Sequence, residues 1–182
     1  MKKSLVISGS GGQGVMSAGI MIAQTAVDAG KCATFLPEYG PEQRGGSAKC
    51  TVVVNDTEII SPLMAKCDTL IVMNEQAYAK YEENVKDGGV LLANSCRVKD
   101  ISRDDNVRVI SAPVDDLALE LGNPKTANII LLGILIGATG IVSREAFVDS
   151  LTAKFTDKKP GVLEMNIRAL DMGVEIGAAQ SK

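Results

Sequence analysis

The chain has 182 residues, of which 46% are hydrophobic and 23% are charged, a balance typical of a folded globular protein and not of a disordered one. Its formal net charge is −3 and only 3% of its residues are aromatic, which argues against a nucleic-acid-binding surface built from basic patches and stacking side chains. The length fits a single domain over 1–182, and no linker or internal repeat divides it.

Hydropathy predicts a cytoplasmic protein that does not enter a membrane. The most apolar stretch, Ile129–Ala138, is about half as long as a membrane-spanning helix. At the start of the chain, Lys2 and Lys3 precede only a short apolar run, so we expect no signal peptide.

Cysteine and histidine usage predicts no metal site and no catalytic residue in this chain. The cysteines, Cys32, Cys50, Cys67 and Cys96, are scattered and form no CxxC pair. We interpret them as small buried residues of a reducing compartment. Histidine is absent, which removes both the commonest general base and the commonest metal ligand.

The first third of the chain has the pattern of a β-α-β unit. Ser4–Ser8 is a short apolar run typical of a buried strand, and a helix is predicted over Val15–Ala29, with Gly30 as its cap. Lys31–Leu36 is the second strand, which we expect to run parallel to the first. A glycine-rich turn connects the first strand to the helix.

A loop and a hairpin are predicted next. Pro37–Gly46 is rich in proline, glycine and mixed charge, which indicates a loop. Ala48–Val54 alternates as a strand does, with Cys50, Val52 and Val54 on one face, and Asn55-Asp56 indicates a turn. Thr57–Ile60 is then the returning strand of an inserted β-hairpin.

The remainder alternates between strands and helices before it becomes entirely helical. The predicted elements are strands at Asp68–Met73, Val90–Asn94 and Asn106–Ile110, and helices at Glu75–Asn84, Val114–Leu121, Thr126–Thr139, Arg144–Phe155 and Gly161–Ile176. Asn74 and Ser143 are the expected N-caps of two of these helices. The order predicts an α/β fold, an open, mostly parallel, Rossmann-like sheet with helices on both faces, one inserted β-hairpin and a helical C-terminal end.

The turn after the first strand matches the pattern GxGxxG at Gly9, Gly11 and Gly14. Glycines let the backbone approach a ligand, and the amino end of the following helix attracts phosphate, so this loop is a candidate anion site. Gly12 and Gln13 lie between these glycines, and we expect the Gln13 side chain to point towards any ligand. The same glycines also allow close packing of a strand and a helix without any ligand, and the pattern alone does not decide between the two.

One feature of a dinucleotide site is missing. Such sites carry an acidic residue at the end of the second strand, about 20 residues beyond the glycines, to bind the ribose. The predicted second strand contains no acid, and Glu38 follows it only after Pro37. A free-standing NAD(P)- or flavin-binding oxidoreductase therefore remains an alternative that explains the glycine loop alone.

Three segments together resemble the gamma subunit of 2-oxoacid:ferredoxin oxidoreductases. They are Gly9–Val15, Tyr39–Gly46 and Lys125–Asn128, and the likeness extends over nearly the whole chain. The combination of GGQG with PEQRGG at this spacing is far more specific than GxGxxG. The resemblance implies a complex that converts a 2-oxoacid and coenzyme A to an acyl-CoA and carbon dioxide and passes electrons to ferredoxin.

The resemblance also implies that this chain is a non-catalytic subunit, inactive alone and bound to alpha- and beta-type subunits, with a delta-type subunit as a further candidate. Thiamine diphosphate, Mg²⁺ and [4Fe–4S] clusters then lie in or with the partners, and none is bound by this chain alone. The candidate contacts with coenzyme A or another anion are Gly9, Gly11, Gly12, Gln13, Gly14 and Arg44. The candidate partner loop comprises Tyr39, Pro41, Glu42, Gln43, Arg44, Gly45 and Gly46.

Overall fold

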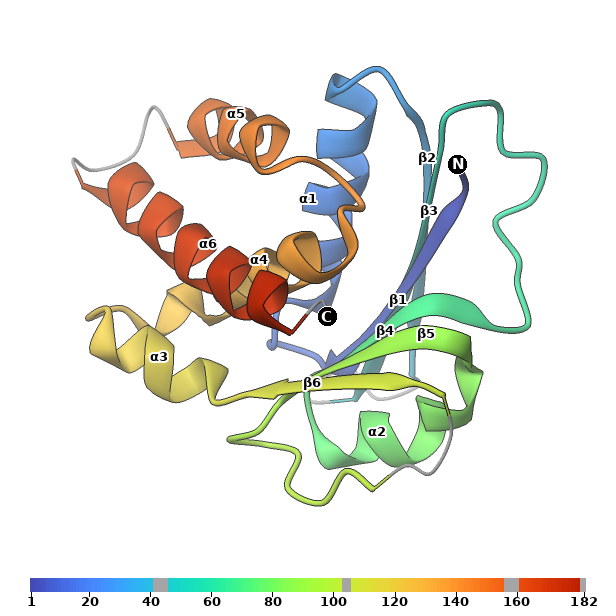
Figure 1. Ribbon diagram of the computed structural model, residues 1–182, viewed down its shortest axis with the longest axis horizontal. Helices are drawn as coiled ribbons and strands as arrows, with labels where there is room; N and C mark the ends of the chain where they lie inside the picture. The colour runs from blue at the N-terminus through green and yellow to red at the C-terminus, as the bar shows by residue number, and fades with distance from the viewer. Residues whose placement is uncertain (41–45, 103–105, 156–160, 181–182) are drawn as a thin grey trace.

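A single sheet with helices on both faces forms the molecule (Figure 1). The structure is a computed structural model, which describes residues 1–40, 46–102, 106–155 and 161–180. The strands are ordered β2-β3-β1-β4-β5-β6 across the sheet. Their bounds are β1 Lys3–Ser10, β2 Cys32–Tyr39, β3 Ser47–Asn55, β4 Cys67–Val72, β5 Val85–Asn94 and β6 Arg108–Ala112.

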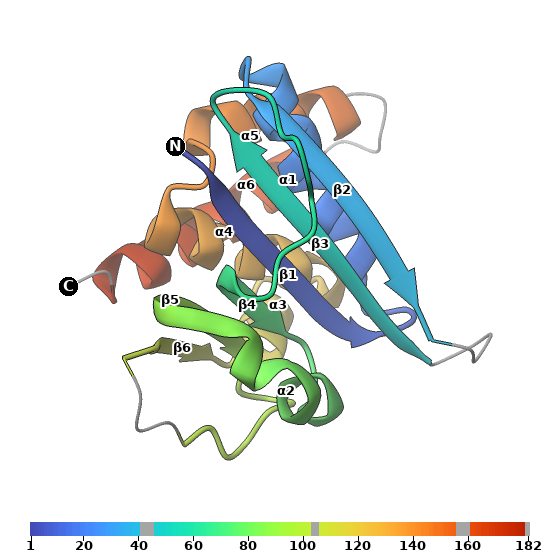
Figure 2. The ribbon, with the colours of Figure 1, turned by 90° about the vertical axis from the view of Figure 1, so that its right-hand side faces the viewer.

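The helices divide unequally between the two faces of the sheet. One face carries α1 (Val15–Asp28), α3 (Val114–Glu120), α4 (Ala127–Thr139), α5 (Arg144–Phe155) and α6 (Val162–Ala179) (Figures 1 and 2). The other face carries α2 (Glu75–Tyr81), followed by a short 3-10 turn at Glu82–Asn84. Both faces of the central strands are therefore buried, and the predicted α/β class and helical C-terminal end are confirmed.

The predicted hairpin is wrong. β1, β4, β5 and β6 are parallel, but β3 is antiparallel to both of its neighbours, β1 and β2. β3 therefore lies between the two strands of the predicted β-α-β unit, which run in the same direction without touching. Thr57–Ile60 is not a strand. The segment at 56–66 instead crosses the outer side of the sheet (Figure 2).

β2 is longer than expected and forms an open edge of the sheet. Pro37 and Glu38 belong to it, not to a loop. The Gly40 N–H donates to the Ser47 carbonyl at 2.7 Å, which sets the alternation of the β2–β3 ladder. By that alternation the nitrogen of Pro37 faces the open edge, where a missing N–H breaks no ladder bond.

Three predicted helix ends are confirmed. Gly30 adopts a left-handed conformation with φ of 79° just after α1, as an αL cap requires. Asn74 accepts the Ala77 N–H at 2.8 Å, and the Ser143 hydroxyl accepts the Ala146 N–H at 3.1 Å. Among the described residues, no helix has the length and apolar character needed to cross a membrane.

Candidate functional site

A crevice lies where the carboxyl ends of the parallel strands meet. α1 leaves β1 on one face of the sheet and α2 leaves β4 on the other, so β1 and β4 form a switch point, where open α/β sheets usually bind ligands. A cavity of about 340 Å³ opens there. It is lined by Gly12 and Gln13 of the glycine loop, Asn94 at the end of β5, Arg97 in the turn after it, and Asn128 of α4.

Two glycines of the loop are required by its backbone and its packing. Gly12 and Gly14 have φ of 91° and 81°, in the left-handed region that other residues rarely adopt. A Cβ on Gly14 would also come within 3.0 Å of the Asn128 amide. Among the described residues, Asn128 makes no hydrogen bond and packs on Gly14.

The glycine loop also continues the sheet. The Gly11 N–H donates to the Gly46 carbonyl at 2.9 Å, one rung beyond the β1–β3 ladder. This rung uses an N–H that the sequence suggested for anion binding, and it joins the loop to the segment that begins at Tyr39. Gly46 is therefore placed beside the glycine loop, and Tyr39 lies at the same end of the sheet with β3 between it and the loop, whereas Pro41, Glu42, Gln43, Arg44 and Gly45 lie outside the described residues.

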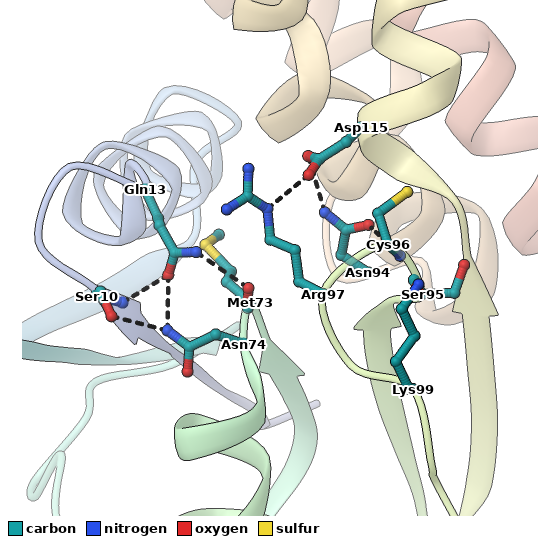
Figure 3. Close-up of polar contacts among 10 residues, drawn as sticks. All are labelled: Ser10, Gln13, Met73, Asn74, Asn94, Ser95, Cys96, Arg97, Lys99 and Asp115. Atoms are coloured by element: carbon teal, nitrogen blue, oxygen red, sulfur yellow. Dashed lines mark hydrogen bonds and ion pairs between the residues drawn. The ribbon is translucent and has the colours of Figure 1, made fainter.

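We expected the Gln13 side chain to point towards a ligand, but its amide is instead bonded within the protein. Its Oε1 accepts the Ser10 N–H at 2.6 Å and the Asn74 amide at 3.0 Å, while its Nε2 donates to the Met73 carbonyl at 3.1 Å (Figure 3). Gln13 lines the cavity, but its amide ties the glycine loop to the end of β4.

The amino end of α1 has no side-chain cap. Gly14 occupies the N-cap position, and no side chain caps the first turn. The first N–H groups of a helix need partners from outside it, and the dipole of the helix favours a negative one. This end of α1 therefore suits an anion that enters the crevice.

The wall opposite the glycine loop carries charged residues that sequence reasoning missed. Arg97 donates from Nε to the Asp115 carboxylate at 2.6 Å, and the same carboxylate accepts the Asn94 amide at 2.9 Å (Figure 3). Lys125, from the resemblance segment before α4, adds a second positive charge to the lining. Asn94 ends a predicted strand, and the rule that ligands bind at the carboxyl ends of parallel strands could have directed attention to it.

Other polar groups named from the sequence have structural partners. Glu38, an acid near the end of β2, pairs with Lys49 of the neighbouring strand β3 at 2.8 Å. Glu75 accepts the Lys99 N–H at 2.8 Å. Neither side chain lines the cavity.

Two of the four cysteines behave as predicted. Cys50 and Cys67 are buried, and burial raises the pKa of the Cys50 thiol to about 12 and that of Cys67 to about 11, so both are protonated at neutral pH. Cys32 is exposed and Cys96 is half-buried, contrary to the expectation. Within the described ranges, no three His, Cys, Asp or Glu side chains gather as metal ligands.

Comparison with known proteins identifies the family. The model of the family described as "Pyruvate ferredoxin/flavodoxin oxidoreductase" matches residues 4–176. The chain belongs to this pyruvate ferredoxin/flavodoxin oxidoreductase family. It is 37% identical to the 2-oxoglutarate synthase subunit KorC of Methanocaldococcus jannaschii, over 97% of this chain and 94% of that subunit. The predicted membership is confirmed, and the comparisons give no support to a free-standing NAD(P)- or flavin-binding enzyme.

Solved structures agree with this assignment. The gamma subunit of a keto/oxoacid ferredoxin oxidoreductase from Geobacter sulfurreducens has a TM-score of 0.85 and 31% identity, and the match covers 100% of this chain and 99% of that one. Some relatives in the family are longer: the chain spans 35% of the ketoisovalerate oxidoreductase subunit VorA of Methanothermobacter marburgensis, at 34% identity over 93% of this chain. The family domain thus occurs both as a separate subunit and within a larger chain.

Proposed function

We propose that this chain is the gamma-type subunit of a multi-subunit 2-oxoacid:ferredoxin oxidoreductase. The observation that supports it most is that described residues of the three resemblance segments contact one another: Gly11 bonds to Gly46, and Gly14 packs against Asn128, which lines the crevice. Similarity over nearly the full length of KorC, and to the gamma subunit structure, agrees with this role. The complex would convert a 2-oxoacid and coenzyme A to acyl-CoA and carbon dioxide, with electrons passing to ferredoxin.

In this proposal the chain is non-catalytic and acts in the cytoplasm. Thiamine diphosphate, Mg²⁺ and [4Fe–4S] clusters are assigned to alpha- and beta-type subunits, with a delta-type subunit as a further candidate. This chain would contribute the partner loop that begins at the exposed Tyr39, and one wall of the path that coenzyme A takes.

The crevice fits a phosphate-bearing part of coenzyme A. Arg97 and Lys125 supply positive charge, and the first turn of α1 has no side-chain cap. The cavity of about 340 Å³ holds only a part of so large a molecule, so partner subunits would cover the rest. The 2-oxoglutarate:ferredoxin oxidoreductase of Magnetococcus marinus, of which 31% of one chain shares this fold, was solved with 2-oxoglutarate, coenzyme A and succinyl-CoA bound.

Affinity purification of the tagged chain from its native cells tests the proposal. We expect it to bring down subunits that carry thiamine diphosphate and iron–sulfur clusters, and the purified complex to reduce ferredoxin only with a 2-oxoacid and coenzyme A. The isolated chain serves as the control and should show no turnover. Turnover by the isolated chain, or a purified chain without such partners, would contradict the proposal.

A further inference from the structure

The turn after β5 holds an arginine in a fixed position over the crevice. The Arg97 and Val98 N–H groups both donate to the Asn94 carbonyl at 2.9 Å, and the Cys96 N–H donates to the Asn94 side chain at 3.1 Å. Asn94 itself is buried, with 6% of its surface exposed. The backbone from which the Arg97 side chain extends is therefore well determined.

Asp115 fixes the direction of the Arg97 side chain. One carboxylate oxygen accepts Nε of Arg97 at 2.6 Å, and the other accepts the Asn94 amide at 2.9 Å. Because Asp115 engages only Nε, the terminal nitrogens Nη1 and Nη2 extend into the space between Asp115 and Gln13 (Figure 3). Among the residues that the structure describes, neither terminal nitrogen has a hydrogen-bond partner.

Holding the Arg97 side chain in one position costs conformational entropy, which a purely structural role does not explain. The Arg97 side chain is 51% exposed, and an exposed ion pair contributes little to stability while it restricts a long side chain. A guanidinium held by Nε presents its terminal nitrogens as a fork that matches two oxygens of a phosphate. Holding the fork in advance lowers the entropy lost when the ligand binds.

We propose that Arg97 recognises a phosphate group of the ligand in this crevice and that Asp115, anchored by Asn94, is its positioning residue. The inference rests on the proposed function, because coenzyme A is the phosphate-bearing ligand that it names. It adds a specificity determinant on the wall opposite the glycine loop, from residues outside all three resemblance segments.

The test uses the purified complex and three thiol substrates that differ in phosphate content. Coenzyme A carries a diphosphate and a 3′-phosphate, dephospho-coenzyme A lacks the 3′-phosphate, and pantetheine has none. We expect Arg97→Ala to raise KM for coenzyme A about tenfold or more, the loss typical of a charged hydrogen bond, with kcat largely retained. KM for pantetheine should not change. Dephospho-coenzyme A shows which phosphate is bound, because the effect persists with it only if Arg97 contacts the diphosphate.

A second pair of variants tests the positioning role. Asp115→Asn should raise KM for coenzyme A by a smaller factor than Arg97→Ala does, and should add nothing in the Arg97→Ala background, since the two residues act through one contact. Arg97→Lys keeps the charge without the fork and should be intermediate. Arg168→Ala, at an exposed arginine of α6 that does not line the cavity, is the matched control and should leave KM unchanged.

Two results would overturn the inference. One is an unchanged KM for coenzyme A in an assembled, active Arg97→Ala or Arg97→Lys complex. The other is an equal rise of KM for coenzyme A and for pantetheine, which would indicate a general effect on packing. A wild-type complex without 2-oxoacid activity would instead contradict the proposed function, so the two failures are distinguishable.

Discussion

The Gln13 amide illustrates how one side chain can shape a site without facing its ligand. It bonds to the Ser10 N–H, the Met73 carbonyl and the Asn74 side chain. Gln13→Ala would leave the first two groups without these partners in a half-buried place. We therefore predict a loss of about 1–3 kcal/mol in the free energy of unfolding, measured by urea denaturation.

Gln24 provides the control for this prediction. Its side chain is exposed on α1 and bonds only to Asp28 within the same helix, at 2.7 Å, among the described contacts. Gln24→Ala should therefore change the free energy of unfolding by less than about 0.5 kcal/mol. Equal effects at the two positions would show that the Gln13 bonds are not needed to hold the loop.

Asp68, at the opposite end of the sheet, makes stability depend on pH. Burial raises the pKa of this carboxyl, but hydrogen bonds from Lys86 and from Ser4 together outweigh it, and the pKa is lowered. A lowered pKa means that the folded state binds the proton less well than the unfolded chain does. The stabilisation is thus present above the ordinary carboxyl pKa of about 4 and is lost as pH falls through the lower, folded value.

This pH dependence predicts how the stability of an Asp68 variant differs from that of the wild type. Asp68→Asn should be less stable than the wild type at pH 7, and the difference should shrink as pH falls below about 4. Chemical denaturation across this range measures it. Asp149→Asn, at an exposed position of α5, should parallel the wild type throughout. A difference between Asp68→Asn and the wild type that is constant with pH would show that the charge of Asp68 is not responsible.

Among the elements, α4 and α6 pack unusually closely because glycines face one another across them. Gly133 and Gly137 of α4 lie against the backbone of α6, and Gly173 and Gly177 of α6 lie against that of α4. A Cβ on Gly173 would come within 3.0 Å of the Ile130 carbonyl oxygen, which a rigid helix cannot move aside. A side chain here must therefore separate the two helices.

We predict that Gly173→Ala destabilises the protein, although alanine favours a helix more than glycine does. Alanine favours a helix by about 1 kcal/mol over glycine, so an unconstrained site would be stabilised. We instead predict a loss of about 1–3 kcal/mol, the usual effect of overpacking, measured by thermal or urea unfolding. Glu175→Ala, exposed on the same helix, is the control and should be close to neutral. A gain in stability for Gly173→Ala would contradict the close packing.

The sequence predicted the elements better than their order in the sheet. Helix starts followed from local chemistry, such as the Asn74 and Ser143 caps, and these needed no knowledge of the rest of the chain. The error at Thr57–Ile60 had a different origin. β3 ends at Asn55, but it inserts between β2, which directly precedes it in the chain, and the distant β1, where Ser10 lies opposite Ser47. No local pattern encodes that insertion, because alternation identifies a strand and not its neighbour.

The candidate site likewise contains residues that the sequence predicted and residues that it did not. The glycine loop was found because its residues are adjacent in sequence and their backbone requirement is visible as glycine. Arg97 and Asp115 were missed because each is an ordinary surface residue in sequence. They form a pair only when β5 and α3 bring them together. The hydrogen bonding of Gln13 was equally hidden, since its partners Met73 and Asn74 lie between β4 and α2, about 60 residues away in the sequence.

At the scale of the whole molecule, the crevice and Tyr39 lie along the same end of the sheet. Tyr39 pairs with Ala48, which pairs with Gly9, so two strand spacings, or about 10 Å, separate Tyr39 from the glycine loop. Its side chain is 72% exposed. Tyrosines are enriched among the residues that dominate protein interfaces, because they bury a large rigid ring and retain a polar tip.

We therefore predict that Tyr39→Ala weakens assembly without weakening the fold. The affinity of the variant for the partner subunits should fall about fivefold or more, as expected when an interface residue contributes over about 1 kcal/mol to binding. The free energy of unfolding of the variant should stay near that of the wild type. Titration of tagged partner subunits with purified chain measures the first quantity. Val27→Ala, a half-exposed apolar residue at the far end of α1, is the control. If Val27→Ala weakens assembly and Tyr39→Ala does not, the partners bind the far end of α1, and the crevice is left open to solvent in the complex.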